Sequence, residues 1–189
     1  PKVVSDMIAT ATDVFGCVDI LISYAVFCLR KTNGSTSRED SHWQDSWDLH
    51  VMAHLRASRL LIPQMTERGF GILVNVASAA GVLSQIGDAD YSATKHAAVS
   101  LAQSLAIEHE QDGIQVSVVC PLYVATPLLG YDPEDVDQRP DGVLLPKDVA
   151  DAVMAGLEAR QFMIFPHPEA QQFFVRRAAD TDRWISGMQ

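Results

Sequence analysis

The chain has few or none of the features that mark several large classes of protein. Its 189 residues hold three cysteines, Cys17, Cys28 and Cys120, which are widely spaced in apolar sequence, so we expect core thiols rather than a disulfide framework or a metal site. No apolar run approaches the roughly twenty residues of a membrane-spanning helix, and the amino terminus has no signal-peptide pattern. These absences predict a soluble, cytoplasmic protein with no membrane partner.

Basic residues are also scarce. Lysine and arginine number 14 against 24 aspartates and glutamates, which gives a formal net charge of −10 at pH 7. This charge would repel the phosphate backbone of a nucleic acid, so we expect no nucleic-acid partner. With 48% hydrophobic residues and no internal repeat or low-complexity tract, the sequence predicts one domain over residues 1–189.

Short apolar runs alternate along the chain with longer helical patterns. The strand-like runs cover residues 18–22, 71–81, 114–121 and 162–165, and the helical patterns cover 1–15, 43–68 and 91–111. Pro63 should kink or end the second of these helices. The alternation predicts an α/β protein with a parallel sheet flanked by helices. Residues 30–42 are expected to form a polar loop with Asn33 and Gly34 at its turn and with solvated charges.

Tyr91 and Lys95 are the most informative residues. In a helix, a four-residue step turns only about 40° around the axis, so both side chains project from one face. A fixed cation there lowers the pKa of a tyrosine from its usual value of about 10, which allows proton exchange nearer neutral pH. Ser78, thirteen residues before the tyrosine, ends a strand-like run and would supply a hydroxyl to the same substrate oxygen. An isolated Tyr-x-x-x-Lys pair is common on helix surfaces, so this interpretation depends on the neighbouring sequence.

The histidines show no metal-ligand spacing. His50 and His54 are four residues apart but lack the nearby acidic pair of a zinc hydrolase, so the sequence predicts no metal site. His42, His54, His96, His109 and His167 are interpreted as exposed or hydrogen-bonded side chains.

An ordered series of motifs resembles the short-chain dehydrogenase/reductase family. The segment 75–81, Asn-Val-Ala-Ser-Ala-Ala-Gly, is similar to the family's Asn-x-Ser-Ser-x-x-Gly, and Tyr91 to Lys95 matches its Tyr-x-x-x-Lys. Residues 121–127 are similar to the Pro-Gly-x-Val-x-Thr segment that lies along the nicotinamide. The resemblance covers the whole chain and implies a Rossmann-like, doubly wound parallel sheet. It also places a mobile lid at residues 130–143, for which a plain surface loop is the alternative.

Part of the family pattern is missing. Family members begin with a glycine-rich Thr-Gly-x-x-x-Gly-x-Gly turn that holds the cofactor's pyrophosphate, and this chain has none. Its first helical pattern corresponds to the helix before the family's fourth strand. We therefore expect about four of seven strands, the carboxyl-terminal two thirds of the fold. Residues 23–26, Ser-Tyr-Ala-Val, replace the usual Asn-Asn-Ala-Gly, and Leu122 replaces a glycine.

The resemblance implies an NAD(P)-dependent oxidoreductase that interconverts an alcohol and a ketone or aldehyde by hydride transfer. Tyr91 would exchange the proton, Ser78 would polarise the carbonyl, and Lys95 would assist the tyrosine and hold the nicotinamide ribose. The cofactor, NAD or NADP, would contact Tyr91, Lys95, Pro121, Val124 and Thr126. The substrate would be a small carbonyl or alcohol compound.

His50 occupies the position of the family's fourth catalytic residue, an asparagine. It lies thirteen residues before Pro63 and twenty-eight before Ser78, counts that His54 does not fit. His50 either joins a proton relay or fills the space of the asparagine.

The sequence leaves open whether the chain is catalytically active and how it assembles. The chain is either an active oxidoreductase or a catalytically impaired relative that serves as an interaction or structural subunit. The helical patterns 43–68 and 91–111 are those the family uses to pair subunits, so we expect a homodimer or homotetramer. Residues 18–22 would form a sheet edge with unpaired backbone groups.

Overall fold

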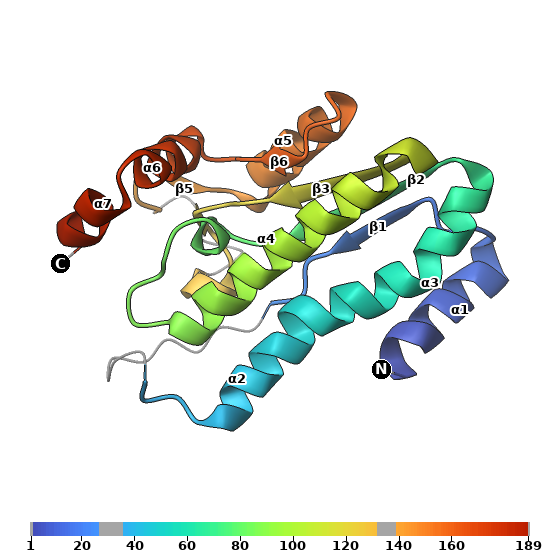
Figure 1. The fold of residues 1–189 in the computed structure, drawn as a ribbon, viewed down its shortest axis with the longest axis horizontal. Coiled ribbons are helices and arrows are strands. Elements are labelled where there is room, and N and C mark those ends of the chain that lie inside the picture. Colours follow the sequence, from blue (N-terminus) through green and yellow to red (C-terminus); the bar gives the residue numbers. More distant parts are fainter. Residues whose placement is uncertain (1, 27–35, 132–138, 189) are drawn as a thin grey trace.

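In the computed structural model, which describes residues 2–26, 36–131 and 139–188, four parallel strands form the main sheet (Figure 1). The sheet has the order β1-β2-β3-β6. Its strands are β1 Ile20–Ser23, β2 Gly71–Val76, β3 Ile114–Val119 and β6 Met163–Ile164. Each strand overlaps one of the four predicted runs. The expected Rossmann-like parallel sheet is therefore confirmed.

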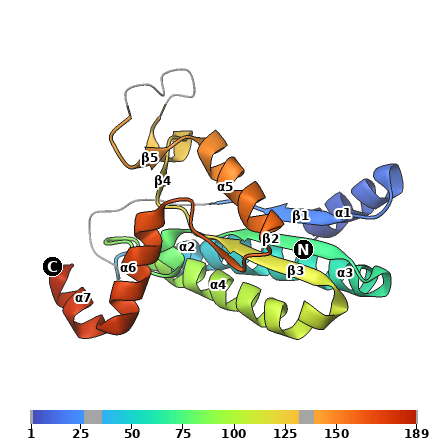
Figure 2. The ribbon, with the colours of Figure 1, turned by 90° about the horizontal axis from the view of Figure 1, so that it is seen from above.

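Seven α-helices accompany the sheet in the described residues. They are α1 Lys2–Phe15, α2 Asp40–Trp47, α3 Ala53–Arg68, α4 Ala89–His109, α5 Pro146–Glu158, α6 Pro168–Ala179 and α7 Thr181–Gly187. Figure 2 shows α3 and α4 on one face of the sheet and α5 on the other. This arrangement is the doubly wound architecture that the family resemblance implied.

Helices on both faces explain why the two central strands, β2 and β3, are largely apolar and buried. On the face covered by α3 and α4, Leu73 and Val118 belong to the larger core with Leu61 of α3. On the opposite face, Val74 and Val119 belong to a second core, against which α5 packs. Since neighbouring side chains in a strand point to opposite faces, β2 and β3 need apolar residues at successive positions.

The predicted helix over residues 43–68 is one irregular helical segment. A π-helical turn, η1 Asp48–Met52, joins α2 to α3. Helix α3 continues past Pro63 to Arg68, so of the two predicted outcomes, a kink or an end of the helix, the helix does not end at this proline. Proline removes one backbone hydrogen bond, and the packing of α3 on the sheet compensates for that loss.

The loop predicted at residues 30–42 differs from expectation in its described part. Helix α2 begins at Asp40, inside the predicted loop, while Asn33 and Gly34 lie outside the described residues. Arg38 is 6% exposed, so the prediction that the charges of this loop are solvated is wrong for that residue.

The prediction that the three cysteines are core thiols is confirmed for one of them and wrong for another. Cys120 is fully buried, and burial raises the pKa of its thiol to about 12, as expected for a core residue. Cys17 is exposed, so the same prediction is wrong there, and Cys28 lies outside the described residues. In the tail, Phe173 packs against Trp184, with ring centroids 6.1 Å apart and ring planes at 45°.

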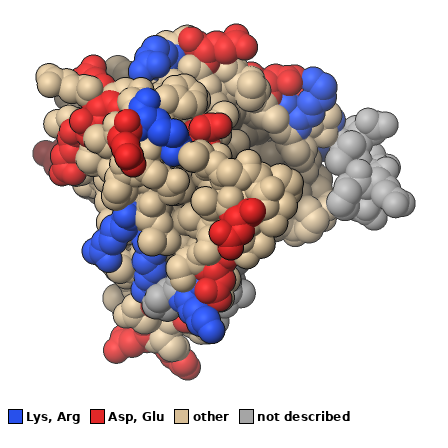
Figure 3. Space-filling view, turned by 90° about the vertical axis from the view of Figure 1, so that its right-hand side faces the viewer, with Lys and Arg blue, Asp and Glu red and all other residues tan. Residues whose placement is uncertain are grey.

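The remaining surface features concern charge and membrane contact. The face toward the right of Figure 1 carries acidic and basic side chains side by side around an uncharged area (Figure 3). Among residues 2–26, 36–131 and 139–188, no helix has the length and apolar content needed to cross a bilayer. The same residues contain no group of three histidine, cysteine or acidic side chains able to hold a metal ion.

Candidate active site

The carboxyl ends of the parallel strands meet at one edge of the sheet, next to a cavity of about 540 Å³. Strands β2 and β3 are paired in register from Gly71 with Ile114 to Val76 with Val119, so the segments that follow them leave the sheet together. In open α/β sheets this edge is where ligands bind. The cavity is lined by three of the four predicted catalytic residues, Ser78, Tyr91 and Lys95, but not by His50. The predicted nicotinamide-contacting residues Pro121, Val124 and Thr126 line it as well.

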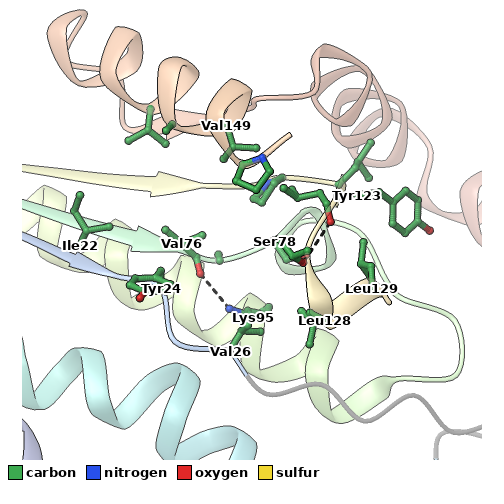
Figure 4. A pocket seen from close by; sticks show the side chains of 18 of the residues that line it. Ile22, Tyr24, Val26, Val76, Ser78, Lys95, Tyr123, Leu128, Leu129 and Val149 are labelled. Atoms are coloured by element: carbon green, nitrogen blue, oxygen red, sulfur yellow. Dashed lines mark hydrogen bonds between the residues drawn. The ribbon is translucent and has the colours of Figure 1, made fainter. Parts of the chain in front are cut away.

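Helix α4 presents Tyr91 and Lys95 to this cavity from one face, as the four-residue spacing predicted. The Lys95 Nζ lies 5.6 Å from the centroid of the Tyr91 ring. It also donates a hydrogen bond to the Val76 carbonyl oxygen at 3.1 Å (Figure 4). Because Lys95 is only 2% exposed, this contact at the end of β2 fixes the position of its cation.

Ser78 is held by a short helical turn, η2 Ala79–Gly81, that starts directly after it. The Ser78 Oγ accepts a hydrogen bond from the Ala80 N–H at 3.1 Å. Gly81 lets this turn approach α4 closely, because an added Cβ would lie 2.8 Å from the Lys95 carbonyl oxygen. The glycine of the motif thus keeps the serine segment packed against the turn of α4 that carries the lysine.

His50 approaches the same group of residues from the π-helical turn η1. Its ring lies edge-on to the Tyr91 ring, with centroids 5.5 Å apart and planes at 89°. Its Nδ1 lies 2.8 Å from the Thr94 Oγ1. The structure therefore brings His50 against the tyrosine, where the resemblance had placed it; its role in proton transfer stays a prediction. Thr94 was not singled out from the sequence.

His54, one helical turn from His50, lies in the interior. It is 1% exposed, and neither of its ring nitrogens has a hydrogen-bond partner among the described residues. The interpretation of this histidine as exposed or hydrogen-bonded is therefore wrong. Burial lowers the pKa of His54 to about 4, so its imidazole is neutral near pH 7. By contrast, His96 and His109 have hydrogen-bonded Nδ1 atoms, as expected.

The wall of the cavity after β3 is held by His167, whose predicted hydrogen bonding is confirmed. His167 is 2% exposed and bridges two backbone groups of this wall. Its Nδ1 accepts a hydrogen bond from the Leu122 N–H at 3.1 Å, and its Nε2 lies 3.0 Å from the Tyr123 carbonyl oxygen. A short second sheet, β4 Tyr123–Val124 with β5 Val143–Leu144, continues the wall. The prolines on both sides of His167 were the only sequence signal for a fixed position.

The start of α4 is held by a buried ion cluster that the sequence did not reveal. The Arg38 Nη2 lies 2.6 Å from the Asp88 Oδ1, and its Nε lies 3.1 Å from the Asp90 Oδ1. The Ser46 Oγ donates to the other oxygen of Asp90 at 3.2 Å. The three charged side chains are at most 4% exposed. They join the segment before α2 to the first turn of the helix that carries Tyr91.

Three departures from the family pattern also lie at the cavity. Figure 4 shows Tyr24 and Val26 on the β1 side, near Lys95, and both line the cavity together with Leu122. The Tyr24 side chain is well exposed at 74%. Asn75, the first residue of the serine motif, is buried, and its Nδ2 has no hydrogen-bond partner among the described residues.

Known proteins with similar sequences and structures are found for this chain. The family model described as short chain dehydrogenase matches residues 1–137. The chain is 31% identical over 154 residues to the ketoacyl reductase HetN of Nostoc sp., a match that covers 82% of this chain and 53% of that protein. It is 28% identical over 167 residues to the D-beta-hydroxybutyrate dehydrogenase of Rhizobium meliloti, covering 86% and 62%. The chain thus spans little more than half of the length of these relatives.

Solved structures give the same fold. A short-chain dehydrogenase from Streptomyces avermitilis superposes with a TM-score of 0.78 at 27% identity, over 97% of this chain and 73% of that one. A short-chain dehydrogenase from Sphingobium yanoikuyae, solved with NADPH, gives a TM-score of 0.73 at 22% identity, over 96% and 72%.

Proposed function

Because this chain belongs to the short-chain dehydrogenase family, we propose that it is an NAD(P)-dependent oxidoreductase that interconverts an alcohol and a ketone or aldehyde. The observation that carries the proposal is the convergence of Ser78, Tyr91 and Lys95 on one cavity at the carboxyl edge of the sheet. A serine hydroxyl, a phenol and a fixed cation around one cavity suit the polarisation and protonation of a carbonyl oxygen.

The cavity suits the nicotinamide end of the cofactor. Pro121, Val124 and Thr126 form a wall on which a flat ring can pack, and the buried Lys95 places a cation where a ribose hydroxyl can accept from it. The cofactor would supply or take up the hydride. The glycine-rich turn that holds a pyrophosphate is not in this sequence, so the described residues account for this end of the cofactor alone.

Tyr91 is the proton donor in the reducing direction. Its phenol would give its hydrogen to the substrate oxygen, while Ser78 would donate a hydrogen bond to the same oxygen and orient it. The nearby Lys95 cation favours the phenolate that results. In the oxidising direction the same phenolate would take the proton of the alcohol. The apolar lining by Leu122, Leu128 and Val149 favours a small, uncharged organic substrate.

The alternative is that the chain is a catalytically impaired relative that serves as an interaction or structural subunit. Three residues that line the cavity favour this alternative. Tyr24, Val26 and Leu122 place bulkier groups than the family's usual residues along the cavity. Titration with NADH and with NADPH, followed by nicotinamide fluorescence, separates the two functions. Saturable binding of either cofactor supports the oxidoreductase, whereas no response to either one from the protein at its full natural length supports the alternative.

We expect His50→Asn to alter the pH dependence of turnover. If the imidazole takes part in proton transfer, the pH–rate profile of the wild type contains an ionisation in the range in which histidines titrate, and the variant lacks it. The variant restores the side chain that the family pattern has at this position, so the pocket should stay intact. The measurement compares kcat against pH for both proteins. Superimposable profiles would leave His50 as a space-filling residue.

We also expect the protein to form at least a dimer. Leu60 of α3 and Ile107 of α4 are 43% and 72% exposed, on the helices that the family uses to pair subunits. Ile20 and Ile22 of β1 are about half exposed, and no described strand pairs with the outer side of β1. Such an edge needs cover from another chain or another segment. Light scattering together with intact-mass measurement tests this expectation, and a monodisperse monomer would contradict it.

A further inference from the structure

The groups around the Thr94 hydroxyl determine where it donates its hydrogen bond. Thr94 lies between Tyr91 and Lys95 on α4 and is 2% exposed. Its Oγ1 lies 2.8 Å from the Asp90 carbonyl oxygen and 3.1 Å from the Tyr91 carbonyl oxygen. Carbonyl oxygens only accept hydrogen bonds, so the single hydroxyl proton points toward these two groups. Toward any other neighbour, the Thr94 oxygen can therefore act only as an acceptor.

That neighbour is His50, whose Nδ1 lies 2.8 Å from the same oxygen. Since Thr94 Oγ1 accepts in this contact, Nδ1 must carry a hydrogen and donate it. A neutral imidazole carries one ring hydrogen, so its Nε2 then has a lone pair and is the basic nitrogen. The His50 ring is 4% exposed and lies edge-on to the Tyr91 ring.

We propose that Thr94 is a positioning residue that holds His50 as the Nδ1–H tautomer and makes Nε2 the nitrogen that gains and loses a proton beside Tyr91. This inference rests on the proposed function and names a part of its proton pathway. When Tyr91 gives its proton to the substrate oxygen and becomes a phenolate, the imidazolium form of His50 returns a proton from Nε2. His50 then becomes the neutral Nδ1–H tautomer, and water protonates Nε2 again. The amide of an asparagine at this position does not titrate and cannot perform this exchange.

The tautomer can be measured without cofactor or substrate. Nitrogen-15 NMR of the ring atoms distinguishes a protonated from an unprotonated nitrogen, and the loss of one ring's signals in His50→Asn assigns His50. In the wild type we expect Nδ1 protonated and Nε2 unprotonated for neutral His50. A wild-type spectrum with Nε2 protonated and Nδ1 bare would overturn the proposal, and this result needs no further variant.

Two substitutions of Thr94 separate hydrogen bonding from packing. Thr94→Val keeps the shape and removes the hydroxyl, so we expect a mixture of tautomers with a larger share of Nε2–H. Thr94→Ser keeps the hydroxyl and loses the methyl group, so the wild-type tautomer should persist. If Thr94→Val leaves the tautomer unchanged, Thr94 only packs against His50 and the proposal fails.

Kinetics of the protein at its full natural length then test the consequence for turnover. We expect Thr94→Val to lower kcat while the KM for the carbonyl substrate stays the same, and Thr94→Ser to restore kcat. The loss should be smaller than the roughly 10²- to 10⁴-fold effect of removing a direct acid–base group. If His50 has the expected Nδ1–H tautomer but the protein has no reductase activity, the proposed function is contradicted and the role of Thr94 is not. If the protein is active but neutral His50 carries its hydrogen on Nε2, only the role of Thr94 is contradicted.

Discussion

Replacing Tyr91 with phenylalanine should remove turnover almost completely and leave the fold unchanged. The substitution deletes one hydroxyl and changes almost no side-chain volume. The Tyr91 side chain lines the cavity, and the centroid of its ring lies 5.6 Å from the Lys95 Nζ. General acid–base groups contribute about 10²- to 10⁴-fold to rates. The measurement is kcat for carbonyl reduction at saturating cofactor, with circular dichroism to show that the fold is kept.

Thr10→Val is the control for this substitution. It also deletes one side-chain hydroxyl, but Thr10 is an exposed residue of α1 that does not line the cavity, so kcat should stay close to the wild-type value. More than a tenth of the wild-type kcat in Tyr91→Phe would exclude the tyrosine as the proton donor.

Replacing Arg38 with methionine should cost roughly 3–5 kcal/mol in the free energy of unfolding. The methionine keeps much of the buried volume but leaves the carboxylates of Asp88 and Asp90 without their cation. Breaking a buried ion cluster by removing one partner is costly because the remaining charges stay desolvated. Against a typical total of about 5–15 kcal/mol, this loss is large, and urea unfolding measures it directly.

Arg56→Met provides the comparison at a solvent-accessible ion pair. Arg56 contacts Asp48 at 2.9 Å, but the two side chains are 25% and 44% exposed, so the loss should be at most about 1 kcal/mol. Adding Asp88→Asn and Asp90→Asn to Arg38→Met should recover part of the lost stability, because the uncompensated charges are then gone. Equal effects of Arg38→Met and Arg56→Met would show that the buried cluster does not stabilise the start of α4.

The part of the site that could be predicted from the sequence depends on local spacing. Tyr91 and Lys95 share a helix face because of the period of the helix, and Ser78 follows a buried strand whose carboxyl end must lie at the ligand-binding edge. The assignment of His50 came from counting along a motif, and the structure places it edge-on to Tyr91. The relative positions of residues that are close in sequence, or that belong to a motif of fixed spacing, can therefore be predicted from the sequence.

Contacts between distant segments could not be predicted in this way. Arg38 has a partner fifty residues away, and a polar loop gave no reason to expect its burial. His167 holds a wall that lies 44 and 45 residues earlier in the chain, and its two flanking prolines indicate a fixed backbone but do not reveal these partners. His54 is interior because α3 packs this turn toward the core, which the histidine itself does not reveal.

Transfer of deuterium from the cofactor to the product tests the central claim most directly. The protein at its full natural length is given a ketone or aldehyde together with NADH or NADPH that carries deuterium at the transferred position of C4, and the product is examined by mass spectrometry. Our account predicts an alcohol that carries the deuterium on its carbinol carbon, with formation that depends on the Tyr91 hydroxyl. Alcohol without the label, or equal labelling rates for the wild type and Tyr91→Phe, would contradict hydride transfer at this site.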